Sequence, residues 1–163
     1  MTLRLDEADV LPFDYGAYAG EISRAVQEVQ KRASEQGINA AEVKPLVEAA
    51  GQLTESAAKL SHALQSGGGL SVDPVAQAKM NRDLASIDQA LLDPDGLRGR
   101  AWYKHTIYAP GSYAGYSAEV LPGPAEALDR KDAAAFEVES KSLTAALHRA
   151  SAKLDEVTKL SGK

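Results

Sequence analysis

Apolar residues recur at alternating steps of three and four between residues 40 and 65, and this periodicity constrains the fold more than any other feature of the sequence. Such spacing places side chains on one face of an α-helix, where they form a seam for neighbouring helices. The stripe consists of Val43, Leu46, Ala50, Leu53, Ala57, Leu60 and Leu64. It predicts a long amphipathic helix over roughly 40–65, whose first turn is left open by Pro45, because proline inside a helix is tolerated only near its start.

Three more segments carry helical stripes. The expected helices span 15–35, 74–92 and 132–160. Residues with capping chemistry stand at their ends, namely Asp14, Gly37, Asp73 and Asp132. The predicted buried residues of the first helix are Tyr18, Ile22, Val26, Val29 and Ala33. Those of the third are Val75, Met80, Leu84, Ile87 and Leu91. Those of the last are Phe136, Ser140, Leu143, Leu147, Ala150, Leu154 and Val157.

Four long helices with two short connections and one long one predict an all-α fold, a four-helix bundle with a long ordered loop between helices three and four. A short helix is expected from Gly123-Pro124 to Leu128, and no segment shows convincing strand alternation. We interpret 1–163 as one domain, with an extended lead-in over 1–14 and an aromatic loop over 93–123.

The long loop concentrates the aromatic residues. Five of the nine aromatic side chains fall within it, namely Trp102, Tyr103, Tyr108, Tyr113 and Tyr116. Glycine and proline interrupt the segment too often for a regular helix. An ordered connection of this length is usually functional, so the helices are interpreted as a scaffold that holds this loop.

Composition narrows the function classes. The chain has 163 residues and a net charge of −5, which argues against a nucleic-acid partner, since that needs a basic face. The absence of cysteine excludes disulfides and thiolate metal sites. No apolar run approaches the roughly 20 residues of a membrane span, and the first residues do not resemble a signal peptide. The apolar stripes are rich in alanine, which suggests a partner surface that completes the core.

The histidines and glycines do not form a recognisable catalytic motif. His62 and His148 lie on expected helices and are interpreted as solvated or structural. For His105 in the loop, a structural hydrogen bond is favoured over a role in a site. Residues 67–69 lack the lysine of a phosphate-binding loop and are interpreted as a linker. Nothing assembles a nucleophile, a base and an oxyanion donor, so the chain is not expected to be an enzyme by itself.

Several motifs, in the right order along the chain, resemble one family. They are Val10-Leu-Pro-Phe-Asp14, Met80-Asn81, Leu91-Leu-Asp-Pro-Asp-Gly-Leu97, Arg100-Ala-Trp-Tyr-Lys-His-Thr-Ile-Tyr-Ala-Pro110, Tyr116 and Leu121-Pro-Gly123. Together they resemble the transferrin receptor-like dimerisation domain, which is the C-terminal domain of glutamate carboxypeptidase II and related zinc peptidases.

The resemblance implies a helical domain that forms a homodimer through its helical faces and packs on the peptidase domain of its own parent chain. No cofactor is expected in this chain, because the zinc ions of that family are bound by the peptidase domain. It also implies that the 98–123 loop reaches the substrate pocket. Within this loop we expect Arg100, Trp102, Tyr103, His105 and Tyr108 to structure it. Members of the family are commonly exported or membrane-anchored, which is our expectation for the parent.

In the family a Lys-Tyr pair on this loop binds the side-chain carboxylate of a terminal glutamate. The matching pair here is Gly115-Tyr116. Tyr116 is therefore a candidate substrate-facing hydroxyl, and a packing role in the loop is the equal alternative. Because Gly115 supplies no charge, we expect the parent to have a different or broader specificity. A lost charge-assisted contact is worth roughly 1.5–3 kcal/mol.

Two other functions are weighed against this one. The first is a receptor-like module that binds a protein ligand and has no associated peptidase activity. The second is a free-standing hydrolase, which fails because the chain lacks the metal ligands. The upstream sequence discriminates between the peptidase and the receptor, because only the peptidase requires zinc-binding His, Asp and Glu residues there.

Overall fold

The chain is mostly helical in the computed structural model, which describes residues 13–66, 74–111 and 118–161. The helices are α2 (Tyr15–Glu35), α3 (Ala40–Ser66), α4 (Pro74–Ala90), α5 (Pro122–Asp129) and α6 (Ala133–Ser161). The prediction of a helical fold is confirmed in this broad sense. The observed ends lie within two residues of the expected ones, because capping and turn residues mark them in the sequence.

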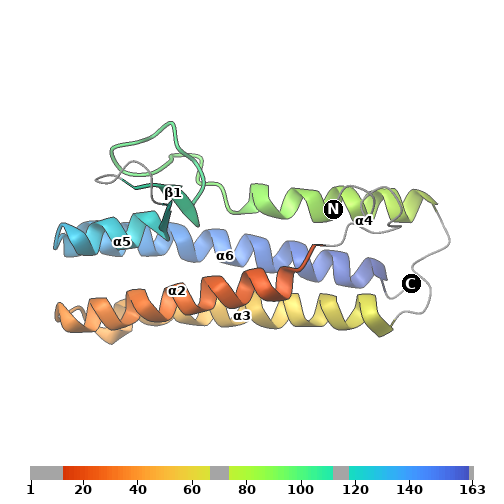
Figure 1. Cartoon of the computed structure of the whole chain (residues 1–163), viewed down its shortest axis with the longest axis horizontal. Coiled ribbons are helices and arrows are strands. Elements are labelled where there is room, and N and C mark those ends of the chain that lie inside the picture. The colour runs from red at the N-terminus through yellow and green to blue at the C-terminus, as the bar shows by residue number, and fades with distance from the viewer. Residues whose placement is uncertain (1–12, 67–73, 112–117, 162–163) are drawn as a thin grey trace.

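The four long helices lie side by side, with α6 at the centre of the contacts (Figure 1). α3 packs along both α2 and α6, while α4 and α5 pack against other parts of α6. A hydrogen bond connects α2 with α4: the Tyr15 hydroxyl donates to the Leu84 carbonyl at 2.6 Å. Burial, with the charge of Asp88, raises the pKa of Tyr15 to about 12.

The core follows the predicted stripes closely. In α3 every expected residue is buried except Leu64, which is half-buried, and in α6 every expected residue is buried. In α2 the stripe is buried from Ile22 onwards, and Tyr18 is half-buried. Large apolar side chains at helical spacing find partners on neighbouring helices, which is why periodicity alone located them.

Val75 is an error of the sequence analysis. It was expected in the core, yet it is 73% exposed. It precedes Met80 by five residues, and at 3.6 residues per turn this rotates it by about 140° from the buried face. The rest of the predicted stripe of α4, from Met80 to Leu91, is buried.

The helix caps explain where the elements begin and end. The Asp14 carboxylate accepts a hydrogen bond from the Ala17 amide, and that of Asp132 accepts one from the Ala135 amide, both at 2.9 Å. Gly37 follows the end of α2 with a φ of +76°, which favours glycine. Asn39, which was not expected to cap, accepts from the Ala41 amide at 2.9 Å. Asp73 lies outside the described residues.

The structure also contains two short strands that the sequence did not indicate. β1 (Tyr108–Pro110) and β2 (Ala118–Val120) pair antiparallel, with Tyr108 opposite Val120. Each strand has three residues, which is too short for an alternating pattern to be recognised in a sequence. The predicted loop over 93–123 therefore contains a small hairpin, and its last two residues belong to α5. Among the helices of the described residues, none combines the length and apolarity needed to cross a membrane.

Candidate functional site

The segment between α4 and α5 is the candidate site, and it stands at one end of α6 (Figure 1). Its backbone is folded on itself by hydrogen bonds. The Asp93 amide donates to the Lys104 carbonyl at 2.8 Å, and the Leu97 amide donates to the Tyr103 carbonyl at 2.9 Å. Further along, the Thr106 amide donates to the Leu91 carbonyl at 3.1 Å. Residues 91–97 are thus hydrogen-bonded to residues 103–106, both near the end of α4 and further into the loop.

Gly96 allows the tightest approach within this loop. It has a φ of +74°, and a Cβ atom placed on it would lie 2.3 Å from the carbonyl oxygen of Ala101. Backbone atoms occupy that space, so a side chain cannot be accommodated by rotation of a neighbour. Gly99 has a similar φ of +78° but open space around it. Substitution of the two glycines therefore distinguishes the cost of a positive φ, which both share, from the cost of steric overlap, which only Gly96 has.

Asp93 fastens the start of the loop to α6. Its carboxylate accepts hydrogen bonds from the Asp95 amide at 2.8 Å and from the Ser142 hydroxyl. Burial is the largest influence and by itself raises the pKa of Asp93. These hydrogen bonds, one from the Gly96 amide and the charge of Arg149 outweigh it, so the pKa lies below its usual value. The ionised carboxylate is therefore the form that the fold stabilises.

Arg100 fastens the middle of the loop to both β1 and α5. Its guanidinium donates to the Pro110 carbonyl at 2.5 Å and forms an ion pair with Glu126. Glu126 is only 5% exposed although it is a carboxylate, and it also lies 3.4 Å from Arg130. A buried carboxylate needs such partners, because its desolvation is costly. The planar guanidinium reaches two acceptors at once, which is the kind of contact that arginine makes and lysine does not.

His105 has partners for both ring nitrogens. Its Nδ1 accepts from the Ile107 amide at 3.2 Å and from the Tyr108 amide at 3.4 Å. An accepting Nδ1 leaves the proton of the neutral ring on Nε2, which lies 3.3 Å from the Asp88 carboxylate. This geometry favours the structural role of His105 over a role in chemistry.

Tyr103 and Tyr108 pack inward, whereas the tryptophan of the loop faces solvent. The Tyr103 hydroxyl donates to the Tyr108 carbonyl at 2.8 Å, and the Tyr108 ring lies 6.4 Å from that of Tyr18 on α2. Burial, followed by the charge and hydrogen bond of Glu21, raises the pKa of Tyr108. Trp102 is 75% exposed, and its ring lies nearly perpendicular to that of Tyr103, with 5.6 Å between the ring centroids. Tyr103 and Tyr108 therefore hold the loop against itself and against α2, and Trp102 lies on its surface.

Gly115 and Tyr116 lie outside the described residues, between the two strands of the hairpin. Their expected contact with substrate stays a prediction. The structure describes the chain up to Gly111 and again from Ala118, on either side of the segment that carries them.

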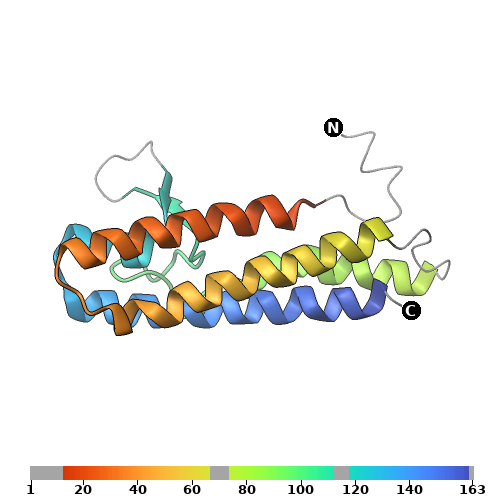
Figure 2. The same cartoon turned by 90° about the horizontal axis from the view of Figure 1, so that it is seen from below.

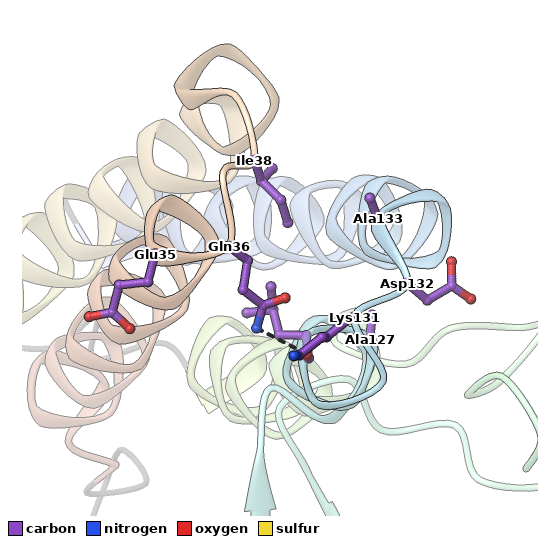
Figure 3. Close-up of a pocket in the computed structure, with 8 residues that line it drawn as sticks. Glu35, Gln36, Ile38, Ala127, Lys131, Asp132 and Ala133 are labelled. Atoms are coloured by element: carbon purple, nitrogen blue, oxygen red, sulfur yellow. Dashed lines mark hydrogen bonds between the residues drawn. The ribbon is translucent and has the colours of Figure 1, made fainter.

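α5 follows the loop directly and contacts α2 as well as α6. Arg32 of α2 forms an ion pair with Asp129 at 2.5 Å. In Figure 3, Gln36 reaches from the turn after α2 toward α5, and its amide donates to the Leu128 carbonyl at 3.0 Å. The hollow there has a volume of about 300 Å³. We interpret it as the gap between two helix–helix turns, because its polar atoms serve these contacts.

α5 packs closely on α6 at Gly123. A Cβ atom there would lie 2.5 Å from the Glu139 carboxylate of α6. Burial raises the pKa of Glu139, and the charge of Asp93 adds to this effect. Just before, Leu121 is fully buried in the left-handed region with a φ of 51°, and its amide donates to the Ile107 carbonyl at 2.8 Å. The Leu-Pro-Gly motif thus builds the corner between β2 and α5.

The acidic partners of the loop were missed by the sequence analysis. Glu126 and Asp88 were not singled out, and Asp93 was interpreted only as part of a turn. Glu139 was interpreted as an ordinary solvated helix charge, whereas it is half-buried. Glu126 lies 26 positions from Arg100, and Ser142 lies 49 from Asp93, so no local spacing connects them. In the described part of the chain, no group of three or more His, Asp or Glu side chains is placed to hold a metal ion.

Comparison with known proteins gives a consistent family. The sequence signature of the transferrin receptor-like dimerisation domain matches residues 41–155. A probable glutamate carboxypeptidase of Arabidopsis thaliana is 31% identical over 130 residues, which cover 79% of this chain and 18% of the relative. One from Zea mays is 29% identical over 139 residues, with coverage of 80% and 18%. An inactive zinc metalloprotease of Schizosaccharomyces pombe is 39% identical over 70 residues, covering 43% and 9%. The chain thus spans less than a fifth of the length of these relatives.

Replacement of Arg100 by leucine is expected to lower the free energy of unfolding by about 3 kcal/mol, because it removes a partner of the buried Glu126. The matched control is Arg98→Leu, whose ion pair with Asp132 is largely exposed and contributes less than about 1 kcal/mol. Urea denaturation of both variants measures the difference. Equal losses would contradict the assignment of Arg100 as the main fastening of the loop.

Replacement of Gly96 by alanine is expected to cost more stability than replacement of Gly99. Both variants place alanine at a positive φ, which costs roughly 1–2 kcal/mol. Only at Gly96 does the methyl group also displace the Ala101 backbone. We expect the near-ultraviolet circular dichroism of Trp102, the single tryptophan, to change in Gly96→Ala alone, because its packing against the Tyr103 ring is disturbed. If Gly99→Ala is as disruptive in denaturation and in circular dichroism, the close approach at Gly96 is not a constraint on the loop.

Proposed function

The chain belongs to the transferrin receptor-like dimerisation domain family, and from this premise we propose that it pairs two subunits of a glutamate carboxypeptidase II-like protein. The match to the family over residues 41–155 carries the proposal. Plant relatives described as probable glutamate carboxypeptidases support the nature of the parent. The four long helices would act as a four-helix bundle whose outer faces meet those of a second copy, in a homodimer of two-fold symmetry.

The second part of the proposal concerns the loop. The 98–123 segment would extend into the substrate pocket of the peptidase domain of the same parent chain. The contacts of Arg100 and Asp93 support this, because a loop that presents side chains to a pocket works best when a rigid scaffold positions it. Tyr116 would supply a hydroxyl to the substrate, and Gly115 would leave the neighbouring position without charge.

Catalysis itself is assigned to the rest of the parent. The proposal places the zinc ions and their ligands in a peptidase domain outside this chain, and it gives this domain no catalytic residue. Its contributions would be subunit pairing, support of the peptidase domain and part of the specificity of the pocket.

A receptor-like protein-binding module is the second candidate. The relative from Schizosaccharomyces pombe favours it, because that protein is described as an inactive zinc metalloprotease and so combines a related segment with a lack of activity. The discriminating observation is the set of zinc-binding residues in the remainder of the parent. An intact set supports the peptidase, and an incomplete one supports the receptor-like module.

Sedimentation equilibrium of this chain tests the pairing. We expect a mass of twice 17.2 kDa that persists on dilution to low micromolar concentration, because the helical faces belong to this domain. A monomer at every concentration would contradict pairing by this domain alone.

Gly115→Lys in the full-length parent tests the part played by the loop. A lysine there restores a charge-assisted contact, so we expect kcat/KM for peptides ending in glutamate to rise roughly ten- to a hundredfold relative to those ending in alanine. Gly115→Gln is the control, because it adds length without charge and leaves the ratio nearly unchanged. An unchanged ratio in Gly115→Lys would contradict the placement of the loop at the pocket.

A further inference from the structure

A pocket of about 430 Å³ lies between the start of α2 and the second half of α4. We call it the α2–α4 pocket. Three aromatic side chains line it, namely Phe13, Tyr15 and Tyr18, together with the buried Leu84 and Ile87. Figure 2 shows that α2 begins partway along the bundle, whereas α3, α4 and α6 continue past its first residue. The pocket stands at this step, and its volume suits a small ligand.

The aromatic rings of the pocket have defined positions. The Tyr15 hydroxyl donates to the Leu84 carbonyl, and the Phe13 ring lies 5.7 Å from the Tyr15 ring at an angle of 60°. Because these two rings are tilted, they do not stack face to face. Phe13 is 47% exposed, so part of its ring is open to solvent. The face of an aromatic ring attracts a cation, most strongly an organic ammonium group.

The lining of the pocket carries negative charge. Among the described residues that line it, Asp14 and Asp88 are acidic and none is basic. The charge of Asp88 reaches both tyrosines, since it adds to burial in raising the pKa of Tyr15 and of Tyr18. His105 contacts Asp88, but it accepts two amide hydrogen bonds through Nδ1, which is the geometry of a neutral ring. The chain therefore does not balance this charge at the pocket.

Both carboxylates keep an oxygen for a ligand. Asp14 accepts from the Ala17 amide through Oδ1, and Asp88 contacts His105 through Oδ1. Within the part of the chain that the structure describes, Oδ2 of each carboxylate makes no hydrogen bond. The Asp88 side chain is 70% exposed, so a ligand is able to reach it. An ammonium group beside it gains a charge-assisted contact.

These features select a class of ligand. The two carboxylates repel an anion. A metal ion such as Ca²⁺ needs several oxygen ligands, but the described residues hold no group of three or more His, Asp or Glu placed for one. A neutral apolar molecule leaves the negative charge without a partner. An organic ammonium ion meets both requirements, because its alkyl groups contact the rings and its charge faces the carboxylates.

We propose that the α2–α4 pocket binds a small organic ammonium ion, with its alkyl groups against the three aromatic rings and its charge beside Asp88. This binding is additional to the proposed pairing and to the proposed role of the loop. It uses residues of one copy of the chain only. A chain that is monomeric at every concentration and still binds such an ion therefore loses the pairing function and keeps this site.

Titration with choline, a small quaternary ammonium ion, tests the site by NMR of the isoleucine methyl groups. Ile87 lines the pocket, whereas Ile38 lies outside it in the turn after α2. We expect the Ile87 methyl signal to shift with a dissociation constant of about 1 mM or below, and the Ile38 signal to stay in place. The control probe is the neutral isostere of choline, in which carbon replaces the nitrogen. We expect it to bind at least about fivefold more weakly. Equal affinity for both probes, or no shift of Ile87, overturns the proposal.

Asp88→Asn tests the contribution of the charge. Asparagine keeps the shape of the side chain, so we expect the dissociation constant of choline to rise roughly tenfold and that of the neutral isostere to stay unchanged. Glu48→Gln on α3 is the matched control, because it removes one exposed negative charge away from the pocket. If both variants weaken choline binding equally, overall charge is the cause and the proposed site is wrong.

Phe13→Leu tests the aromatic wall. Leucine remains apolar but has no aromatic face, so we expect choline to bind about threefold more weakly while the neutral isostere binds as before. The partial exposure of Phe13 keeps the effect of this change on stability small. An unchanged affinity for choline would contradict the ring contact on which the proposal depends.

Discussion

The buried stripe of α6, from Phe136 to Val157, is the constraint on which the rest of the structure depends. α3, α4 and α5 all pack on this helix, so the side chains on its inner face are shared by most of the core. Apolar burial along one continuous helix is non-directional and strong, and it tolerates the alanines that alternate with larger residues. Because α6 is long, its first half also supplies the surface on which the loop and α5 rest.

The loop is organised by a different kind of force. It contributes few side chains to the core, and it is positioned by charged groups with fixed geometry. Arg100 joins β1 to the buried Glu126, and Asp93 joins the start of the loop to Ser142 on α6. Such contacts are directional, and breaking one leaves a buried group without its partner. The helices therefore determine that the domain folds, while these polar contacts determine where the loop lies.

Pairing of subunits and presentation of the loop are proposed for different parts of the domain. The loop and hairpin stand at one end of α6 (Figure 1). A domain with this arrangement is able to join a second subunit without obstructing its loop. The alanine-rich stripes agree with this, because helices with small side chains bury modest area within one chain and gain more from a second copy.

What the sequence determined by itself was the set of helices and the inner face of each, because periodicity and capping are local properties. Leu46 and Leu147 were placed in the core by spacing alone, and Asp14 and Asp132 were identified as caps by residue type. Val75 failed because its spacing to the next member of the stripe is irregular.

Only the tertiary structure decided how the loop is held. The partners of Arg100 and Asp93 are distant in sequence, and three-residue strands carry no periodic signal. The burial of Ser140 was predicted from its stripe, but its lack of a hydrogen-bond partner appeared only in the structure. Contacts of this kind depend on where helices meet in space, and no local pattern encodes that.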